Sequence, residues 1–367
     1  MRKGIILMPY VSGRGGTETV VHNLFLSFKN EKNIKLKLIL IGGTTNINWL
    51  KGIDYEETII SKFLKLNESK LIRNAYYACV LVPEIIKIIQ KEDPDFLIST
   101  NPVIWTLVKK ITKIFQKKIP VIAWYHFSLK ERPIKSMLLY SADYYLAISS
   151  GIRDQLIDKG IEPNKIFLIY NPVDSDNNII LRPQDHVKFI YIGRLMLQGQ
   201  KNLKELFDAL SKVHGNWSLD LYGDTQISKE RAEIKKYVSK NKIDKKINWK
   251  GFVKDPWNEI QNATALILTS KYEGLPMVLC EAISHGLFCV SSDIETGPVD
   301  IINKKNGKLY QSGNVSQLTN ILQEIVDQPK ALPSQVKIIE TSEKFALDQY
   351  KNNFMTAIFK ILGEVSK

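Results

Sequence analysis

Cysteine is scarce in this sequence. The 367 residues include three cysteines, Cys79, Cys280 and Cys289, and each stands singly in an apolar segment. This pattern argues against a disulfide framework and against a cysteine-based metal site. Single thiols in apolar surroundings are typical of the reduced core cysteines of a cytosolic protein.

Long apolar runs are missing too. No run approaches the roughly 20 residues that span a bilayer. The stretch M-R-K-G-I-I-L-M-P-Y has a basic head, but its apolar run ends at Pro9 and lacks the length and the cleavage site of a signal peptide. We interpret this stretch as the first strand and expect a cytoplasmic protein.

Two sets of cofactor motifs are also absent. In a dinucleotide fingerprint G-x-G-x-x-G that begins at Gly13, the third glycine would fall at position 18, which is Glu18. This argues against a dehydrogenase. Neither D-x-D nor a His/Cys cluster with ligand spacing lies beside a predicted site, so we expect no metal ion and no cofactor.

Acidic residues are outnumbered, with 38 Asp and Glu against 51 Lys and Arg and a net charge of +13. Residues 1–172 hold 25 basic and 15 acidic residues, and the remainder holds 26 and 23. One interpretation is a solvated, lysine-rich surface. The other is attraction to an anionic partner such as membrane lipid, a phosphorylated glycan or nucleic acid. The lack of clustered aromatic and basic strands counts against nucleic acid.

The segment 107–118 carries part of this charge. Its lysines recur at helical spacing opposite an apolar stripe, and they are Lys109, Lys110, Lys113 and Lys117. Such a helix can lie on an anionic membrane surface. An ordinary surface helix of a basic protein has the same pattern.

Apolar strands alternate with helical patterns along the whole chain, which predicts an α/β fold. The length suits two domains. We predict an N-terminal domain at 1–172, a polar, proline-flanked linker at 173–187, a C-terminal domain at 188–341 and a last helix at 342–367. That helix has one apolar face, formed by Phe345, Tyr350, Phe354, Ile358 and Ile361.

The most informative stretch is 263–283. A buried strand, 263–269, is followed by a break at Gly274 and a helix that starts near Pro276, because proline suits the first turn of a helix. Free N–H groups at a helix start, at the carboxyl end of a parallel sheet, favour a phosphate. The residues expected at this anion site are Gly274, Leu275, Pro276, Met277 and Val278.

Two carboxylates, Glu273 and Glu281, flank the expected anion site. Acid groups are poor phosphate ligands, but the hydroxyls of a sugar nucleotide donate well to carboxylates. The alternative is a surface helix with glutamate near the positive end of its dipole.

The run E-G-L-P-M-V-L-C-E, from Glu273 to Glu281, resembles the E-x7-E signature of glycosyltransferase family 4, the large retaining group with the GT-B fold. The resemblance implies two Rossmann-like doubly wound domains that face each other across a cleft, with a C-terminal helix that crosses back to the first domain. It also implies that Glu273 contacts the transferred sugar and that Glu281 contacts the ribose hydroxyls.

The diphosphate that leaves a sugar nucleotide needs fixed positive charge when no metal is present. Gly193-Arg194 and Lys201-Asn202 resemble the phosphate-binding pair of this family. Arg194 can donate two hydrogen bonds to phosphate oxygens, and Lys201 adds a point charge. The loop at Gly251, with Phe252 and Val253, resembles the contact to the nucleobase.

Two features of the first domain complete the candidate site. The loop G-G-T-E, with Gly15, Gly16 and Glu18, resembles the family's first loop, which faces the donor pyrophosphate across the cleft and lies beside the acceptor. A plain strand–helix turn is the alternative. His126, after V-I-A-W-Y, is expected to hydrogen-bond the donor sugar; the alternative is a satisfied core histidine.

Further segments, including W-Y-H-F-S-L, L-A-I-S-S-G-I and G-R-L-M-L-Q-G-Q-K-N, are similar to the lipopolysaccharide core 1,6-galactosyltransferases. We therefore expect a retaining, metal-independent glycosyltransferase that moves a hexose, with galactose as first candidate, from a UDP-sugar to a bacterial surface glycan or glycolipid. We place it in the cytoplasm, with the inner face of the plasma membrane as a second location.

Three alternatives stay open. One is transfer from UDP-glucose or UDP-N-acetylglucosamine to another surface polymer. The others are a UDP-sugar epimerase and a non-catalytic basic binding partner.

Overall fold

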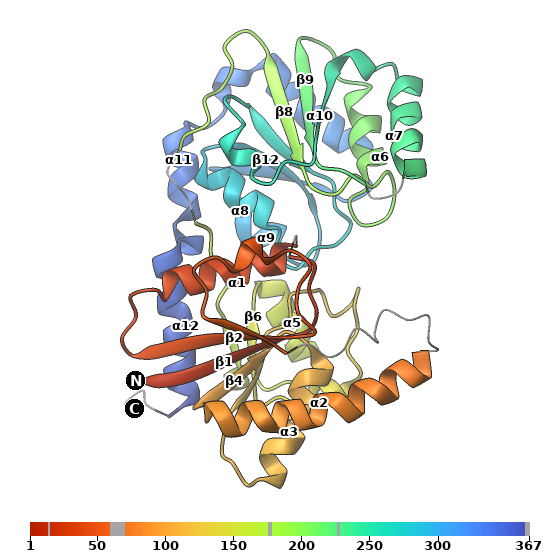
Figure 1. Ribbon diagram of the computed structural model, residues 1–367. Coiled ribbons are helices and arrows are strands. Elements are labelled where there is room, and N and C mark those ends of the chain that lie inside the picture. Colours follow the sequence, from red (N-terminus) through yellow and green to blue (C-terminus); the bar gives the residue numbers. More distant parts are fainter. Residues whose placement is uncertain (14, 59–69, 175–177, 226–227, 364–367) are drawn as a thin grey trace. The chain divides into compact units, whose positions relative to one another are not determined.

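The structure is a computed structural model, and the residues that it describes are 1–13, 15–58, 70–174, 178–225 and 228–363, with the backbone alone for 70–78. The chain divides into two compact units (Figure 1). The first unit is Met1–Pro172 together with Leu347–Lys367, and the second is Val173–Ala346.

The first unit has a seven-stranded sheet of order β3-β2-β1-β4-β5-β6-β7, and every neighbouring pair is parallel. Residues Ile5 to Met8 of β1 are 0% exposed, as expected where helices cover both faces of a parallel sheet. The strands are β1 (Arg2–Met8), β2 (Ile34–Ile41), β3 (Tyr55–Thr58), β4 (Phe96–Ser99), β5 (Val121–Ala123), β6 (Tyr144–Ala147) and β7 (Ile166–Leu168).

Helices cover both faces of this sheet. The helices are α1 (Gly16–Ser27), α2 (Lys70–Glu92), α3 (Pro102–Ile114), α4 (Ser136–Leu139) and α5 (Ser150–Asp158). Figure 1 shows α1 on one face and α2 and α3 on the other. Side chains fix two of the helix starts: Asn101 accepts the N–H of Val103 at 2.9 Å, and Ser149 accepts the N–H of Ile152 at 3.3 Å.

The second unit has a six-stranded sheet of order β10-β9-β8-β11-β12-β13, again parallel throughout. The strand order reverses between β8 and β11, so this is the point where open α/β sheets bind ligands. The strands are β8 (Val187–Ile192), β9 (Trp217–Tyr222), β10 (Ile247–Gly251), β11 (Ala265–Leu268), β12 (Phe288–Asp293) and β13 (Gly307–Gln311).

The helices of the second unit connect these strands and follow the last one. They are α6 (Leu203–Leu210), α7 (Ser228–Lys240), α8 (Met277–Ser284), α9 (Pro298–Ile301), α10 (Val315–Asp327) and α11 (Gln335–Ile339). Short 3-10 helices lie in both units, at η1 (Ile47–Leu50), η3 (Pro163–Lys165), η4 (Asp244–Lys246), η5 (Pro256–Asn258), η6 (Pro329–Ala331) and η7 (Glu340–Phe345).

The last helix, α12 (Leu347–Ile361), belongs to the first unit, where it packs against α1. The Phe354 ring meets the Phe28 ring edge-on with 5.3 Å between centroids, and Lys351 pairs with Glu31 at 2.7 Å. This pairing lowers the pKa of Glu31 to about 2. The chain therefore leaves the first unit after Pro172 and returns to it at Leu347.

The start and the end of the second unit differ from the boundaries expected from the sequence. The segment 173–187 belongs to the second unit, where Val173 donates its N–H to Phe345 and Ile180 donates to His285, at 2.8 and 3.1 Å. The last helix begins at Leu347, because residues 340–345 form a 3-10 helix that stays in the second unit.

The expected fold class, α/β with two parallel-sheet Rossmann-like domains, is confirmed. Within the residues described above, none of the helices has both the length and the apolar character that a bilayer crossing requires.

Candidate functional site

The loops that follow β8 and β11 meet at the switch point of the second unit. Their strands are neighbours in register, with Phe189 beside Ala265. Beyond the strands, the Thr269 hydroxyl donates to the Lys201 carbonyl at 3.0 Å, and the Lys271 N–H donates to the Gln200 carbonyl at 2.8 Å. These bonds bring together two segments about 70 positions apart in the sequence.

An ion pair lies at the centre of this junction. The Lys201 ammonium stands 2.7 Å from a Glu273 carboxylate oxygen, and the two side chains are 14% and 11% exposed. Both side chains are thus largely buried. Removal of one partner would leave the other charge buried without a counter-charge.

Gln200 connects this pair to Arg194. Its amide oxygen accepts from an Arg194 guanidinium nitrogen at 2.9 Å, and its amide nitrogen donates to the Tyr272 carbonyl at 3.1 Å and to Glu273 at 3.5 Å. A neutral amide therefore separates the guanidinium from the carboxylate. Arg194 is exposed, and its other guanidinium N–H groups have no hydrogen-bond partner among the described residues, so they can donate to an anion. The sequence singled out Arg194, Lys201 and Glu273 but gave no role to Gln200.

Two glycines allow the neighbouring loops to come close. A Cβ on Gly223, which has φ +141°, would lie 1.8 Å from the Gly193 carbonyl oxygen. The Gly223 N–H in turn donates to Gly251 at 2.7 Å. The main chain of Gly223, after β9, thus lies against Gly193 after β8 and is hydrogen-bonded to Gly251 at the end of β10.

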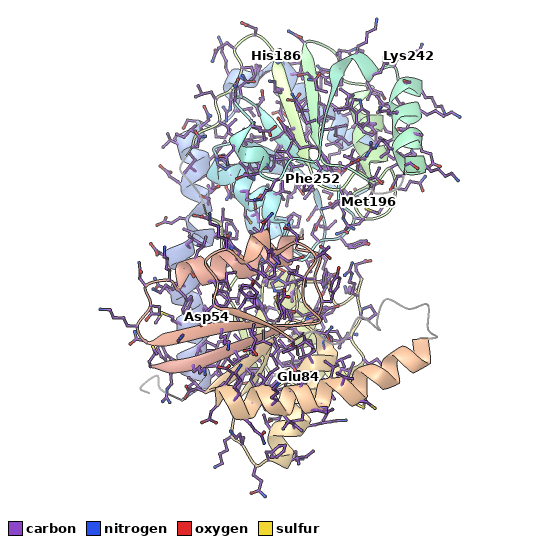
Figure 2. The ribbon with its side chains drawn as sticks, in the orientation of Figure 1. Asp54, Glu84, His186, Met196, Lys242 and Phe252 are labelled. Carbon is purple, nitrogen blue, oxygen red and sulfur yellow. The ribbon has the colours of Figure 1, made fainter. Side chains whose placement is uncertain are left out.

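Phe252 and Val253 follow β10, the edge strand of the same sheet. Phe252 is 61% exposed. Figure 2 labels Phe252 together with Met196, a residue of the loop after β8. Phe252 thus presents an exposed aromatic ring at the carboxyl end of the sheet.

Helix α8 starts as the proline pattern indicated, though one residue later. Pro276 is the residue before the first helical turn, no side chain caps the helix, and Met277 and Val278 are its first residues. Leu275 therefore lies in the preceding loop with Gly274. Gly297, which has φ +98°, packs on this loop, because a Cβ there would lie 2.5 Å from the Pro276 ring.

Glu281 lies one turn along α8 and half-buried. One of its carboxylate oxygens accepts the indole N–H of Trp257 at 2.9 Å. Burial raises the pKa of the Glu281 carboxyl; the Trp257 hydrogen bond lowers it in part, and the negative charge of Asp255 raises it further. Trp257, like Gln200, had no role in the sequence interpretation, because a lone tryptophan carries no motif.

The G-G-T-E loop of the first unit is closed by its own glutamate. Glu18 is 6% exposed, and one carboxylate oxygen accepts the Gly13 N–H at 2.9 Å. Gly15 precedes α1, and a Cβ there would lie 2.6 Å from the other Glu18 oxygen. Gly16 has open space around it. The contacts of Glu18 are thus those of a residue that shapes the loop.

His126 lies three residues beyond β5 in the first unit and is 8% exposed. Its ring packs on Trp124 with centroids 4.6 Å apart, and its Nε2 atom is buried with no hydrogen-bond partner among the described residues. Burial lowers the pKa of His126 to about 3, so the ring is neutral near pH 7. An unsatisfied buried nitrogen costs about 1–3 kcal/mol and calls for an explanation.

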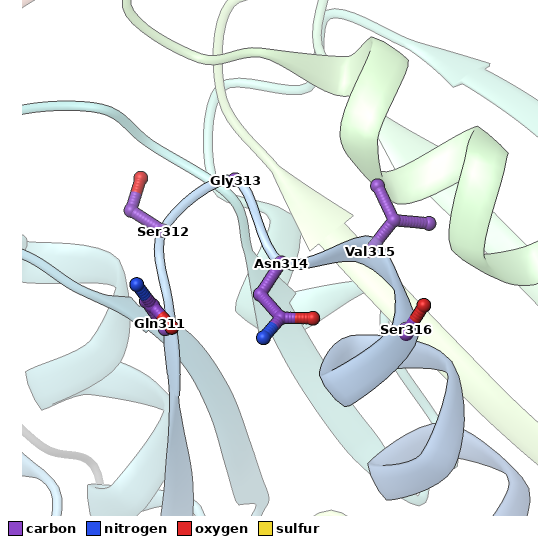
Figure 3. Close-up of a pocket in the computed structure, with 6 residues that line it drawn as sticks. All are labelled: Gln311, Ser312, Gly313, Asn314, Val315 and Ser316. Atoms are coloured by element: carbon purple, nitrogen blue, oxygen red, sulfur yellow. The ribbon is translucent and has the colours of Figure 1, made fainter.

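The second unit also has a shallow polar hollow, formed by Gln311–Ser316 between β13 and α10 (Figure 3). None of the candidate residues named above lines it. It consists of a single loop without charged side chains, and we assign it no role.

Comparisons with known proteins agree with this geometry. Residues 173–345 match the family described as glycosyl transferases group 1, and residues 14–177 match glycosyltransferase family 4. The lipopolysaccharide 1,6-galactosyltransferase of Salmonella typhimurium is 33% identical over 96% of this chain and 97% of its own length. The Escherichia coli enzyme of the same name is 32% identical over 96% and 95%.

Solved structures give the same result. The apo form of the lipopolysaccharide outer core galactosyltransferase WaaB has a TM-score of 0.83 and 32% identity, with 98% of this chain and 99% of that chain covered. The Anabaena protein HepE in complex with UDP has a TM-score of 0.78 at 16% identity, over 97% and 100% of the two chains, which shows likeness of fold.

The buried His126 generates a prediction about acid stability. Its pKa is about 3 in the folded chain against an ordinary 6.5, so the unfolded state takes up a proton first as the pH falls. The His126 contribution to the free energy of unfolding should then fall by about 1.4 kcal/mol per pH unit below 6.5. In urea unfolding, the free energy of unfolding of wild type, relative to that of His126→Gln, should fall by about 2 kcal/mol between pH 7 and pH 5.

His214→Gln, at an exposed histidine, is the matched control for this substitution. Parallel pH dependence in wild type and His126→Gln would contradict a buried, neutral imidazole.

Proposed function

The chain belongs to glycosyltransferase family 4, and from this premise we propose that it transfers galactose from UDP-galactose to a lipopolysaccharide core or a related bacterial surface glycan. It is a glycosyltransferase. The observation that carries the proposal is the cluster of Arg194, Gln200, Lys201 and Glu273 beside the start of α8. The choice of sugar and acceptor rests on the names of the two lipopolysaccharide 1,6-galactosyltransferases.

The cluster suits a nucleoside diphosphate as leaving group. When the bond between the sugar and the diphosphate breaks, negative charge grows on the phosphate oxygens. Arg194 offers a bidentate fork and Lys201 a compact charge, and α8 adds uncapped N–H groups. In the free chain Glu273 neutralises Lys201. Donor binding gives each a new partner, a phosphate oxygen for Lys201 and sugar hydroxyls for Glu273.

We propose retention of configuration on the family resemblance. An acceptor hydroxyl attacks the anomeric carbon on the face from which the diphosphate departs, and its proton passes to the departing phosphate. No enzyme nucleophile is needed in this step. His126 would serve as a neutral hydrogen-bonding group for the sugar, which is consistent with its unsatisfied Nε2 and its lowered pKa. The roles of Gly15, Gly16 and Glu18 toward the donor remain predictions.

The proposed role of Glu273 can be tested by Glu273→Gln. The amide keeps the shape of the side chain but removes the charge that accepts sugar hydroxyls and balances Lys201. Transfer from UDP-galactose to a purified lipopolysaccharide core, measured as UDP release, should fall at least 100-fold, whereas UDP should still raise the melting temperature. Glu233→Gln, at an exposed position in the same unit, should retain full activity.

Retained activity in Glu273→Gln would remove the central residue of this proposal. A panel of UDP-galactose, UDP-glucose and UDP-N-acetylglucosamine in the same assay tests the sugar. Preferred use of either of the last two would replace galactose.

We also propose that transfer needs no metal ion, because Arg194 and Lys201 supply the positive charge that a metal otherwise supplies. Transfer should proceed at an unchanged rate after dialysis against EDTA. A loss of activity that magnesium or manganese restores would contradict this assignment.

A peripheral membrane location is the last part of the proposal. The expected lysine stripe is only partly free: Lys109 pairs with Asp143 at 2.5 Å and Lys117 with Asp93 at 2.6 Å. Within 107–118, the exposed lysines that form no ion pair with the described residues are Lys110, Lys113 and Lys118. Helix α3 ends at Ile114, so Lys117 and Lys118 lie beyond it. Ile114 is 75% exposed beside these charges.

Replacement of Lys110, Lys113 and Lys118 by glutamine should weaken co-sedimentation with anionic liposomes on the order of 100-fold, since each lysine near such a surface contributes about 1 kcal/mol. The same change at Lys304, Lys305 and Lys330, exposed lysines of the second unit, is the control with equal loss of charge. Equal sedimentation of the two triple variants would leave α3 an ordinary solvated helix.

A further inference from the structure

The Glu281 carboxylate is held through one of its two oxygens. The hydrogen bond that the structure describes to it comes from the Trp257 indole, at 2.9 Å to Oε2. A carboxylate has about four acceptor positions, so Oε1 keeps its capacity to accept. Two adjacent hydroxyls of a ribose ring match this arrangement.

The donor to Glu281 is neutral. An indole N–H can donate but carries no charge, so it orients the carboxylate without cancelling its negative charge. A lysine or arginine in the same place would compete with the hydroxyls of a ligand. A group that fixes a binding side chain in advance raises affinity, because less rotational freedom is lost on binding.

The Trp257 side chain is held in place by the His285 ring. Its ring stacks on the His285 ring with centroids 4.9 Å apart and 28° between planes. The His285 Nδ1 lies 2.7 Å from the Asn178 carbonyl oxygen, and the His285 carbonyl accepts from Ile180 at 3.1 Å. The indole therefore rests on a ring that two main-chain contacts anchor.

We propose that Trp257 is a positioning residue for the nucleotide: its indole N–H orients the Glu281 carboxylate so that the other oxygen accepts the ribose hydroxyls of the donor. This inference rests on the proposed UDP-sugar activity. It assigns a role to a residue of the 3-10 helix η5, outside the E-x7-E signature.

The proposal has a consequence for pH. The groups near Glu281 are Asp255, which precedes η5, Trp257 in η5, Cys280 on α8 and His285, which directly follows α8. Burial keeps the Cys280 thiol neutral by raising its pKa. The Trp257 N–H favours the ionised carboxylate, against burial and Asp255. Removal of the Trp257 N–H should raise the Glu281 pKa further. As the pH is lowered, the carboxylate that binds ribose would then become protonated at a higher pH than in wild type.

The test is the dissociation constant of UDP, measured by calorimetry between pH 5 and pH 8, for wild type and Trp257→Phe. Phenylalanine keeps a ring over His285 and removes the N–H. We expect UDP to bind on the order of tenfold more weakly at pH 7, and the pH below which binding weakens to move upward. Trp257→Leu, whose side chain has no hydrogen-bond donor, replaces the phenylalanine variant if the latter does not fold.

Trp217→Phe is the matched control, because the Trp217 N–H donates to the Val213 carbonyl at 3.0 Å in the core of the same unit. It should lose some stability but keep the wild-type pH profile for UDP. In a Glu281→Gln background, Trp257→Phe should cause no further shift with pH.

The outcomes separate the two proposals. Wild-type protein that does not bind UDP would contradict the proposed function. Wild-type protein that binds UDP, together with a Trp257→Phe variant of equal affinity and equal pH profile, would overturn the positioning role alone.

Discussion

The ion pair between Lys201 and Glu273 joins the two loops on which the candidate site is built. Each residue follows one of the two strands at the switch point of the second sheet, and the 2.7 Å contact lies largely out of water. The Thr269 hydroxyl and the Lys271 N–H also donate to main-chain carbonyls of the Lys201 loop, so hydrogen bonds reinforce the ion pair. In the function we propose, Lys201 exchanges this partner for a phosphate oxygen and Glu273 exchanges it for sugar hydroxyls.

Neutral side chains hold two charged groups of the site, Arg194 and Glu281. Gln200 lies between Arg194 and Glu273, and Trp257 holds Glu281. If Arg194 paired directly with Glu273, both charges would be satisfied before a ligand arrived. The amide and the indole provide geometry at little electrostatic cost, so that the arginine fork and the second glutamate remain available for binding.

Local patterns predicted the strand–loop–helix unit around Glu273 well. Strand β11 lies within the expected 263–269, and α8 begins one residue after Pro276, because proline fixes φ at a helix start without loss of a hydrogen bond. The last helix was placed less well. Residues 340–345 have helical periodicity, but they turn as a 3-10 helix in the second unit, so α12 begins at Leu347. Which unit a helical segment joins depends on packing partners far away in the sequence.

The sequence by itself determined the class of the fold, the alternation of strands and helices, and the identity of the charged residues that follow β8 and β11. These features depend on periodicity, on proline and glycine conformation and on a short motif, and all of these are local. Only the tertiary structure decided that Gln200 bridges Arg194 and Glu273, that Trp257 binds Glu281 and that Glu18 closes its own loop. The bonds from Gln200 to Glu273 and from Trp257 to Glu281 join side chains more than 20 positions apart. The Glu18 carboxylate fits its loop because Gly15 has no Cβ to meet it. Contacts of this kind arise from strand order and loop geometry, which no local pattern records.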